Sequence, residues 1–304
     1  MRPQEKDIRV PGPAREGRSG AGGARTAGIV LAGGRSTRMG RPKASLEWHG
    51  STLLYRIAGI VARAVDGPVV VVRAAGQQLP SLPPSVRVVE DAREGRGPLQ
   101  GLAAGLTAVA GDAELVYVSS TDVPLLHPVF VAAVLAAADR EDVDVALPVA
   151  QGFKQPLAAA YRTSLLADVE ELIVSDRMRP AFLFERCRVR ELGESDLLRD
   201  ARLVRADPDL LSLRNLNNPA DYEEARARPE PPVSVRRFGT LAPTRDREPL
   251  ALCAATLGTA AAAAGVRLDR HVVAALNGDQ ISRDPELPLA AGDVLAFLAA
   301  DAGG

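Results

Sequence analysis

The chain has 304 residues, enough for one large domain or two ordinary ones, and no stretch of it approaches the ~20 consecutive apolar residues that a membrane span requires. The formal net charge is −1 and aromatic residues make up 4%, which excludes the strong basic field and the base-stacking platforms of general nucleic-acid binding. Two cysteines and three histidines are too few and too scattered for a disulfide scaffold or a thiolate or imidazole metal site. We therefore expect a cytoplasmic protein with no membrane and no nucleic-acid partner.

The first 26 residues are rich in arginine, glycine and proline and contain no apolar run that would form the core of a signal peptide. This composition predicts a disordered leader over residues 1–26. From Ala27 onward, the strand pattern AGIVLA, a glycine-rich loop, the amphipathic helix pattern TLLYRIAGIVARAV and the strand pattern PVVVVR form a βαβ unit.

Strand and helix patterns then continue to alternate through VRVVE, PLQGLAAGLTAVA, ELVYVS, PVFVAAVLAAAD and VDVALPV. The strand patterns are short apolar runs without polar alternation, so we expect helices on both faces of the sheet. These features predict an α/β domain over residues 27–228, Rossmann-like and with a mostly parallel sheet.

A second, smaller domain is predicted after the proline-rich segment RPEPPV, because tandem prolines disfavour a helix and favour a short extended linker, here residues 229–232. The remaining residues 233–304 contain the strand VSVRRFG, an alanine-rich helix around LALCAATLGTAAAAAG, the strand HVVAALNG and a last strand in DVLAFLAADAGG. We expect a small α+β domain here, with Cys253 in the core of the helix.

The segment from Leu31 to Lys43, LAGGRSTRMGRPK, follows the first strand, where an open α/β sheet normally places its ligand crevice. Glycine lets backbone N–H groups approach an anion closely, while Arg38, Lys43 and their basic neighbours supply positive charge. The segment is neither a Walker P-loop nor GxGxxG, so it is interpreted as a phosphate cradle of another kind.

This loop resembles the signature of the nucleotidyltransferases, and in this form it is most similar to the molybdenum cofactor guanylyltransferases of the MobA type. The similarity continues through Glu90-Asp91, GPLQGL, TDVPLL, QPLAAAYR and NLNNPADY, in the family's order, over roughly residues 27 to 228. The resemblance implies transfer of GMP from GTP to the terminal phosphate of molybdopterin or the molybdenum cofactor, with release of pyrophosphate. It favours GTP over CTP, because LAGG accompanies guanine use in the family and LAAG accompanies the cytidylyl relatives.

Asp122 directly follows the strand ELVYVSS, so its carboxylate should lie at the edge of the sheet beside the glycine loop. One such carboxylate, with waters and substrate phosphates, suits Mg²⁺; alternatively, Asp122 only begins the turn before Pro124. The resemblance implies that Asp122 binds the metal and that Asp91 lies near the ribose and base, although Asp91 taken alone is a loop acid.

Two asparagines, Asn215 and Asn217, flank an apolar residue just before a helix that starts near Pro219. Similarity to the family's N-x-N-T-P segment implies that one of their amides reaches the substrate, whereas the residues alone favour a helix cap at Asn217 or Asn218. The resemblance thus implies Lys43, Arg38 and Asp122 as catalytic residues. It gives the nucleotide site as Leu31, Ala32, Gly33, Gly34, Arg38, Lys43, Asp91 and Asp122.

The last domain resembles the small β-grasp sulfur carriers of the MoaD and ThiS type, on the segments VSVRRFG, AALNGDQI and PLAAGDVLAF and on the terminal Gly303-Gly304. In such carriers the final glycine is adenylated and becomes a thiocarboxylate. This implies two protein partners, an adenylating sulfur-transfer enzyme and a molybdopterin synthase large subunit. Taken alone, the final Gly-Gly is more typical of a frayed terminus.

Three alternatives remain open at this point. The enzyme can be a cytidylyltransferase or another nucleotidyltransferase with a different phosphorylated acceptor. The chain can instead be a sulfur carrier attached to an inactive transferase domain, or an active transferase whose last domain only docks a partner.

Overall fold

The computed structural model describes residues 23–33, 42–91, 97–242 and 248–299. The chain forms two compact units that divide between Pro229 and Glu230. No helix in the described part of the chain is long and apolar enough to cross a membrane.

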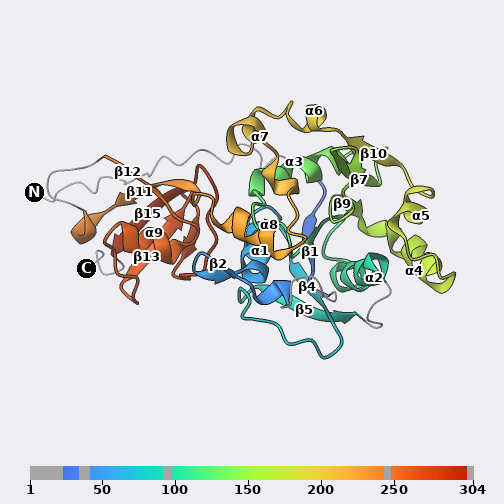
Figure 1. The fold of residues 1–304 in the computed structure, drawn as a ribbon, viewed down its shortest axis with the longest axis horizontal. Helices are drawn as coiled ribbons and strands as arrows, with labels where there is room; N and C mark the ends of the chain where they lie inside the picture. Colours follow the sequence, from blue (N-terminus) through green and yellow to red (C-terminus); the bar gives the residue numbers. More distant parts are fainter. Residues whose placement is uncertain (1–22, 34–41, 92–96, 243–247, 300–304) are drawn as a thin grey trace, which may run out of the picture. The chain divides into compact units, whose positions relative to one another are not determined.

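The larger unit is built on a mixed sheet whose strands follow the order β10-β7-β9-β6-β1-β4-β5, with β8 paired to β7 (Figure 1). The strands are β1 Thr26–Leu31, β4 Val69–Ala74, β5 Val86–Asp91, β6 Leu115–Ser120, β7 Val145–Ala150, β8 Phe153–Lys154, β9 Ala158–Arg162 and β10 Val189–Leu192. A separate short hairpin joins β2 Glu47–Trp48 to β3 Ser51–Thr52.

Strands β5, β4, β1 and β6 run parallel, as do β7 and β10, whereas β9 is antiparallel to both of its neighbours. The sequence predicted a mostly parallel sheet and did not place a reversed strand in its interior. Residues of β9 are nearly all buried, with Ala159 and Ala160 fully so, because β6 and β7 lie on its two edges and helices cover the sheet.

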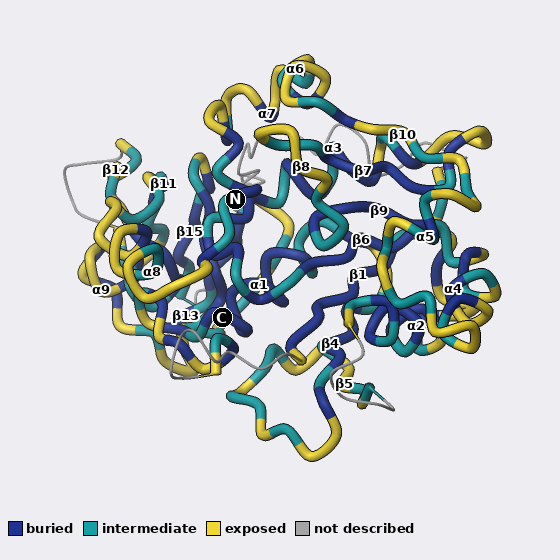
Figure 2. Tube along the Cα trace, turned by 45° about the vertical axis from the view of Figure 1, so that its right-hand side comes forward, coloured by how far each residue is buried: buried dark blue, intermediate teal, exposed yellow. Residues whose placement is uncertain are grey.

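Helices cover both faces of this sheet, as the apolar strand patterns predicted. The helices are α1 Leu53–Ala62, α2 Pro98–Val109, α3 Pro128–Ala138, α4 Leu166–Val174, α5 Pro180–Phe184, α6 Glu194–Leu197, α7 Ala201–Ala206 and α8 Pro219–Arg226. Figure 2 shows the central strands as buried segments inside a more exposed shell of helices and loops. One core cluster packs Ile29, Leu31 and Val72 of the sheet against α2 and α4.

Helix α2 packs closely against β1, because glycine leaves no side chain where the two elements meet. A Cβ atom at Gly105 would lie 2.6 Å from Cγ2 of Ile29, and one at Gly101 would lie 3.1 Å from Cδ2 of Leu31. At the start of the helix, Gly97 has φ of 96°, a conformation that side chains disfavour. The glycines of GPLQGLAAG therefore place the first turn of α2 against the end of β1.

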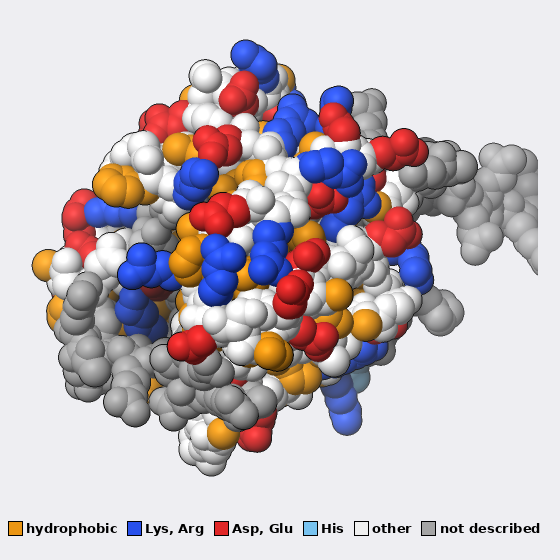
Figure 3. Space-filling model, turned by 90° about the vertical axis from the view of Figure 1, so that its right-hand side faces the viewer, with side chains coloured by type: hydrophobic (Ala, Val, Ile, Leu, Met, Phe, Trp, Pro, Cys, Tyr) orange, Lys and Arg blue, Asp and Glu red, His pale blue; other side chains and the backbone are white. Residues whose placement is uncertain are grey.

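The surface of the larger unit carries both signs of charge side by side. Figure 3 shows lysine, arginine and carboxylate side chains interspersed over the face that includes α4 and α5. Ion pairs of this region join Arg177 to Glu185 and Arg186 to Glu171. Charges of opposite sign therefore partly offset one another over this face.

In the described residues, the smaller unit is a five-stranded sheet in the order β12-β11-β15-β13-β14, and helix α9 packs against one face of it. Its elements are β11 Pro232–Arg237, β12 Leu250–Cys253, α9 Leu257–Ala263, β13 Val272–Leu276, β14 Gln280–Ser282 and β15 Val294–Ala299. The first and last strands, β11 and β15, pair in parallel at the centre, and the other pairs are antiparallel.

One sequence expectation for this unit is wrong. Leu250–Cys253 forms strand β12 along β11, not the start of the alanine-rich helix, and Cys253 is exposed instead of belonging to a helical core. The helix begins only at Leu257, because the Thr256 side chain accepts a hydrogen bond from Thr259 N–H and caps it.

Candidate functional site

A pocket of about 560 Å³ opens at the carboxyl ends of β1, β4 and β6, beside the first turn of α2. Six of the residues predicted for the nucleotide site line it: Leu31, Ala32, Gly33, Lys43, Asp91 and Asp122. Two others, Gly34 and Arg38, lie outside the described residues. Sequence positions up to 91 residues apart thus meet at one edge of the sheet, as expected for parallel strands.

The centre of the pocket wall is an ion pair between Lys43 and Asp122. Lys43 Nζ donates hydrogen bonds to Asp122 Oδ2 at 2.8 Å and to the carbonyl oxygen of Leu216 at 2.6 Å. Both charged side chains are about one-fifth exposed. The pair is therefore shielded from bulk water yet open to a ligand in the pocket. As a whole it is formally neutral, and the Lys43 ammonium group is the part of it that attracts phosphate oxygens.

The position of Asp122 follows from the end of strand β6. Ser120, the last residue of β6, donates a hydrogen bond from its hydroxyl group to Asp122 Oδ1. The backbone carbonyl of Asp122 accepts a hydrogen bond from Leu216 N–H at 2.8 Å. Buried Arg56 on α1 donates from Nε to the Pro124 carbonyl at 2.6 Å and holds the loop that follows. The loop is thus fixed before any ligand binds.

The segment that contains Asn215 and Asn217 contacts the Lys43–Asp122 pair through its backbone. Leu216, between Asn215 and Asn217, contacts both Lys43 and Asp122, whereas neither asparagine is among the described residues that line the pocket. Asn218 caps α8 by accepting from Asp221 N–H, which was one of the two caps expected from sequence. Hydrogen bonds from Asn217 N–H and then Asn218 N–H lower the pKa of the Asp221 carboxyl group.

Two features around Gly33 suit a nucleotide phosphate or base. A Cβ atom at Gly33 would lie 3.4 Å from Ala74 N, at the close limit of ordinary van der Waals contact, so a side chain here would fill space next to the end of β4. The first turn of α2, with Pro98 at its start, also lines the pocket. The N-terminal end of a helix carries partial positive charge, which favours an anion nearby.

Arg73 and Gln77 are among the polar residues of the pocket that sequence reasoning did not assign to the site. Arg73 pairs with Glu90 at 2.7 Å and donates from its other terminal nitrogen to the Gln77 carbonyl at 3.1 Å. The side chain of Gln77 bonds to Ala32 and Ala74. Neither residue belongs to a motif. Gln77 lies in the loop after β4, where a polar residue such as glutamine is expected and so gives no functional signal.

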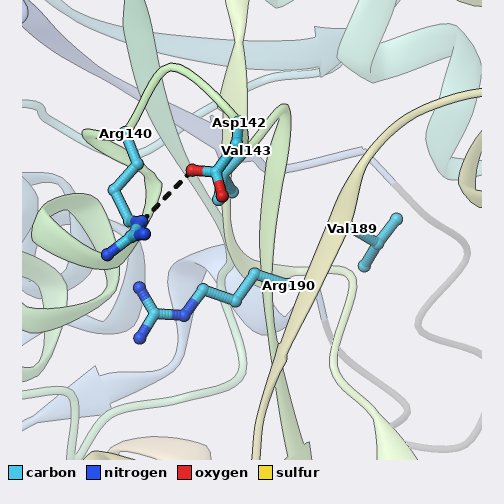
Figure 4. A pocket seen from close by; sticks show the side chains of 5 residues that line it. All are labelled: Arg140, Asp142, Val143, Val189 and Arg190. Carbon is cyan, nitrogen blue, oxygen red and sulfur yellow. Dashed lines mark hydrogen bonds and ion pairs between the residues drawn. The ribbon is translucent and has the colours of Figure 1, made fainter.

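A second pocket, of about 350 Å³, lies near the opposite edge of the sheet, where β7 and β10 begin. Figure 4 shows the guanidinium groups of Arg140 and Arg190 extending into it, with Arg140 Nε bonded to Asp142 Oδ1 at 3.2 Å. Arg140 and Asp142 are both more than half exposed. Water screens such charges, and none of the predicted nucleotide-site residues lines this pocket, so nucleotide chemistry is assigned to the first one.

The residues present fit a magnesium ion better than a zinc ion. The described residues contain no group of three or more His, Cys, Asp or Glu side chains that could hold a metal. The described residues that line the pocket include two carboxylates, Asp91 and Asp122, beside space for phosphate groups. Magnesium needs only one or two carboxylates when waters and substrate phosphates complete its shell.

Comparison with known proteins agrees with this geometry. Residues 28–189 match the family model described as the MobA-like NTP transferase domain. A probable molybdenum cofactor guanylyltransferase of Mycobacterium avium is 39% identical over 150 residues, covering 48% of this chain and 74% of the relative. One of Mycobacterium bovis is 37% identical over 197 residues, covering 64% of this chain and 90% of the relative.

The fold also matches a solved structure. The molybdopterin-guanine dinucleotide biosynthesis protein A of Archaeoglobus fulgidus superimposes with a TM-score of 0.51 at 21% identity, over 66% of this chain and 96% of that chain. This likeness supports the nucleotidyltransferase-type α/β fold of the larger unit. The relatives above align with at most about two-thirds of this chain.

Proposed function

Because the chain belongs to the MobA-like NTP transferase family and is a nucleotidyltransferase, we propose that it transfers GMP from GTP to the terminal phosphate of molybdopterin or of the molybdenum cofactor. The curated relatives named as probable molybdenum cofactor guanylyltransferases support this assignment, since one is matched over 90% of its length. The structural observation that carries it is the Lys43–Asp122 ion pair in the wall of the pocket beside Gly33.

The proposed reaction is an in-line displacement at the α-phosphorus of GTP. An oxygen of the acceptor's phosphate forms a new bond to this phosphorus while the bond to the bridging oxygen of the β-phosphate breaks, and pyrophosphate leaves. No protein nucleophile is required, because positioning and neutralisation of charge supply most of the catalysis in such reactions.

The chain's own residues have separate tasks in this proposal. Lys43 neutralises charge on the phosphates, and the backbone at Gly33 approaches the nucleotide. Asp122 would hold Mg²⁺, which supplies further charge neutralisation at the phosphates when bound. Arg38 and Gly34, outside the described residues, are proposed to add charge and a backbone donor. Asp91 contacts the ribose or base, and Asn215 or Asn217 contacts the acceptor.

For the smaller unit we propose a β-grasp fold and a sulfur-carrier role. With strands numbered in their order within the unit, the sheet reads 2-1-5-3-4, with parallel central strands and one helix on one face; this arrangement supports a β-grasp assignment. The Gly304 carboxylate, which lies outside the described residues with Gly303, would attack the α-phosphorus of ATP and release pyrophosphate. A sulfur donor would then displace AMP and leave a thiocarboxylate.

We also propose the substrates and protein partners of the chain and the boundaries of its domains. The partners are GTP, molybdopterin or the molybdenum cofactor, an adenylating sulfur-transfer enzyme and a molybdopterin synthase large subunit. We propose a leader over residues 1–26, a transferase domain over 27–228, a linker over 229–232 and a carrier domain over 233–304, in a cytoplasmic protein. Each domain's first strand begins one residue before the proposed boundary, β1 at Thr26 and β11 at Pro232.

The transfer is tested by pyrophosphate release with molybdopterin as acceptor, magnesium present, and GTP compared with CTP. GTP-selective release that is lost in Asp122→Ala supports guanylyl transfer. Equal or greater release with CTP would replace it by cytidylyl transfer. No release with either nucleotide, from folded protein with intact acceptor, would remove the transferase proposal.

The carrier role is tested separately by deleting Gly303 and Gly304. The full chain and the deletion variant are incubated with ATP, a sulfur donor and the adenylating enzyme, and intact mass is measured. Replacement of one oxygen by sulfur in the full chain alone supports the carrier, while guanylyl transfer should be equal in both. An unmodified full chain would instead leave the smaller unit as a docking module.

A further inference from the structure

The side chain of Gln77 stands between two strands at the mouth of the nucleotide pocket. Its Nε2 donates to the Ala32 carbonyl, just beyond β1, at 3.0 Å. Its Oε1 accepts from Ala74 N–H, the last residue of β4, at 2.9 Å. Both bonds use backbone groups, so the carboxamide bridges the ends of two neighbouring parallel strands, which Figure 1 shows side by side.

These two backbone groups would be partners in an uninterrupted sheet. Ala32 N–H donates to the Val72 carbonyl at 2.8 Å, as the β1–β4 ladder requires. In a regular parallel ladder the next bond would run from Ala74 N–H to the Ala32 carbonyl. The carboxamide of Gln77 takes the place of this bond, since one side accepts from Ala74 and the other donates to Ala32. The strands are thereby held apart by one amide group where the pocket opens.

The bridge also sets the direction of the next peptide group. In an extended strand the N–H and C=O of one residue point to the same neighbour, and those of the next residue point to the other. Both groups of Ala32 point toward β4. The peptide between Ala32 and Gly33 is trans, so Gly33 N–H points away from Gln77, toward the side of β6. Asp122 follows the end of β6 on that side.

The main chain of Gln77 is itself anchored. Arg73 donates to the Gln77 carbonyl at 3.1 Å and is held by Glu90 at 2.7 Å, and Gln77 N–H donates to the Ala74 carbonyl at 3.0 Å. The side chain therefore starts from a fixed point, which lowers the entropy lost in making both bonds.

We propose that Gln77 is a positioning residue of the transferase. Its carboxamide takes the place of one backbone hydrogen bond of the β1–β4 ladder, separates the ends of the two strands and directs Gly33 N–H toward the bound nucleotide. This role rests on the proposed use of the pocket for the nucleotide. It does not depend on the identity of the acceptor, because the residues involved lie at the nucleotide end of the site.

The first test replaces the carboxamide of Gln77 with an apolar side chain of similar size, in Gln77→Leu. Misalignment of one hydrogen bond to a charged group should weaken nucleotide binding about tenfold, measured as the dissociation constant for GTP with magnesium and as the nucleotide KM. The value of kcat should change less than KM, because the Lys43–Asp122 pair is untouched. Gln78→Leu, at an exposed neighbouring position, is the matched control.

The second test uses pH to restore the missing donor. In Gln77→Glu the ionised carboxylate still accepts from Ala74 N–H but repels the Ala32 carbonyl, whereas the protonated form donates to it. The carbonyl stabilises this neutral form and raises the carboxyl pKa. The affinity ratio of wild type to variant should therefore fall from about tenfold near pH 8 toward one as pH drops to about 5. Gln78→Glu should show no such change.

The outcomes separate the two proposals. The Gln77 carboxamide has no positioning role if wild type binds GTP and the dissociation constant of Gln77→Leu for GTP is within twofold of the wild-type value. It also has none if the loss of GTP affinity in Gln77→Glu does not change with pH. If Gln77→Leu fails to fold, the pH profile of Gln77→Glu still decides. If wild type binds neither GTP nor CTP, the proposed function fails and the role of Gln77 fails with it.

Discussion

Lys43 Nζ and Asp122 Oδ2 lie 2.8 Å apart although their residues come from different segments of the chain, one after the glycine loop and one after β6. The same ammonium group reaches the Leu216 carbonyl, so three segments meet at one cation. This ion pair and the bond to Leu216 hold both side chains in place in the wall of the pocket.

The first prediction concerns the charge at this point. Lys43→Ala should lower the rate of nucleotidyl transfer about 10²–10³-fold, because a fixed positive charge next to the reacting phosphates is lost. Lys154→Ala is the matched control, since Lys154 is half exposed, pairs with Glu191 and does not line the pocket. Initial rates of pyrophosphate release measure both variants. Equal loss in the two variants would mean that the effect is not local.

The second prediction concerns the close packing of α2 on β1. Gly105→Ala places a Cβ atom 2.6 Å from Ile29 Cγ2 and should destabilise the larger unit by about 1–3 kcal/mol, because core overpacking forces side chains or backbone to shift. Ala104→Gly on the same helix adds no atoms and should cost only about 0.5–1 kcal/mol through helix propensity. Denaturant unfolding measures both. A Gly105→Ala variant as stable as wild type would show that the helix can move outward freely.

The third prediction is a pH dependence of stability at Asp144. Hydrogen bonds from the Arg188 side chain hold the pKa of the Asp144 carboxyl group below its usual range in the folded chain. A group whose pKa is depressed by folding contributes stability above its unfolded pKa, near 4, and loses it as pH falls through the lower folded value.

This contribution should be modest, because Arg188 is more than half exposed and water screens the pair. Asp144→Asn should therefore reduce the free energy of unfolding by about 1 kcal/mol near pH 7 and by less near pH 3. Glu141→Gln, at an exposed carboxylate of the same loop, is the control. Unfolding measured at both pH values checks the sign, and a loss that grows toward low pH would contradict the argument.

The fourth prediction separates the two cysteines. Burial, with smaller effects of Asp144 and Asp168, raises the pKa of the Cys187 thiol to about 11. The thiolate is the reactive form, so Cys187 should alkylate slowly at neutral pH. Exposed Cys253 on β12 should react first. Iodoacetamide labelling followed by peptide mass analysis checks the order, with Cys253→Ser as control; faster labelling of Cys187 would contradict it.

Local patterns in the sequence determined much of this protein. Apolar runs predicted most strands of the larger unit, because strands covered on both faces must be apolar throughout. The same patterns predicted that Gly33, Lys43 and Asp122 lie at one edge, because parallel strands bring their carboxyl ends together. Asp91 was assigned to the site only through the family resemblance. The helix predicted for the stretch around Leu250 was wrong. Its leucines and alanines favour a helix, but hydrogen bonding to β11 makes it a strand.

Only the tertiary structure decided how distant groups pair. The reversed strand β9 between β6 and β7, the reach of Lys43 to the Leu216 carbonyl and the bridge of Gln77 between Ala32 and Ala74 leave no periodic or motif signal. Each depends on hydrogen bonds between backbone groups or side chains far apart along the chain. Such bonds are selected by the geometry of the folded sheet, because backbone groups are the same at every position and their partners exist only after folding.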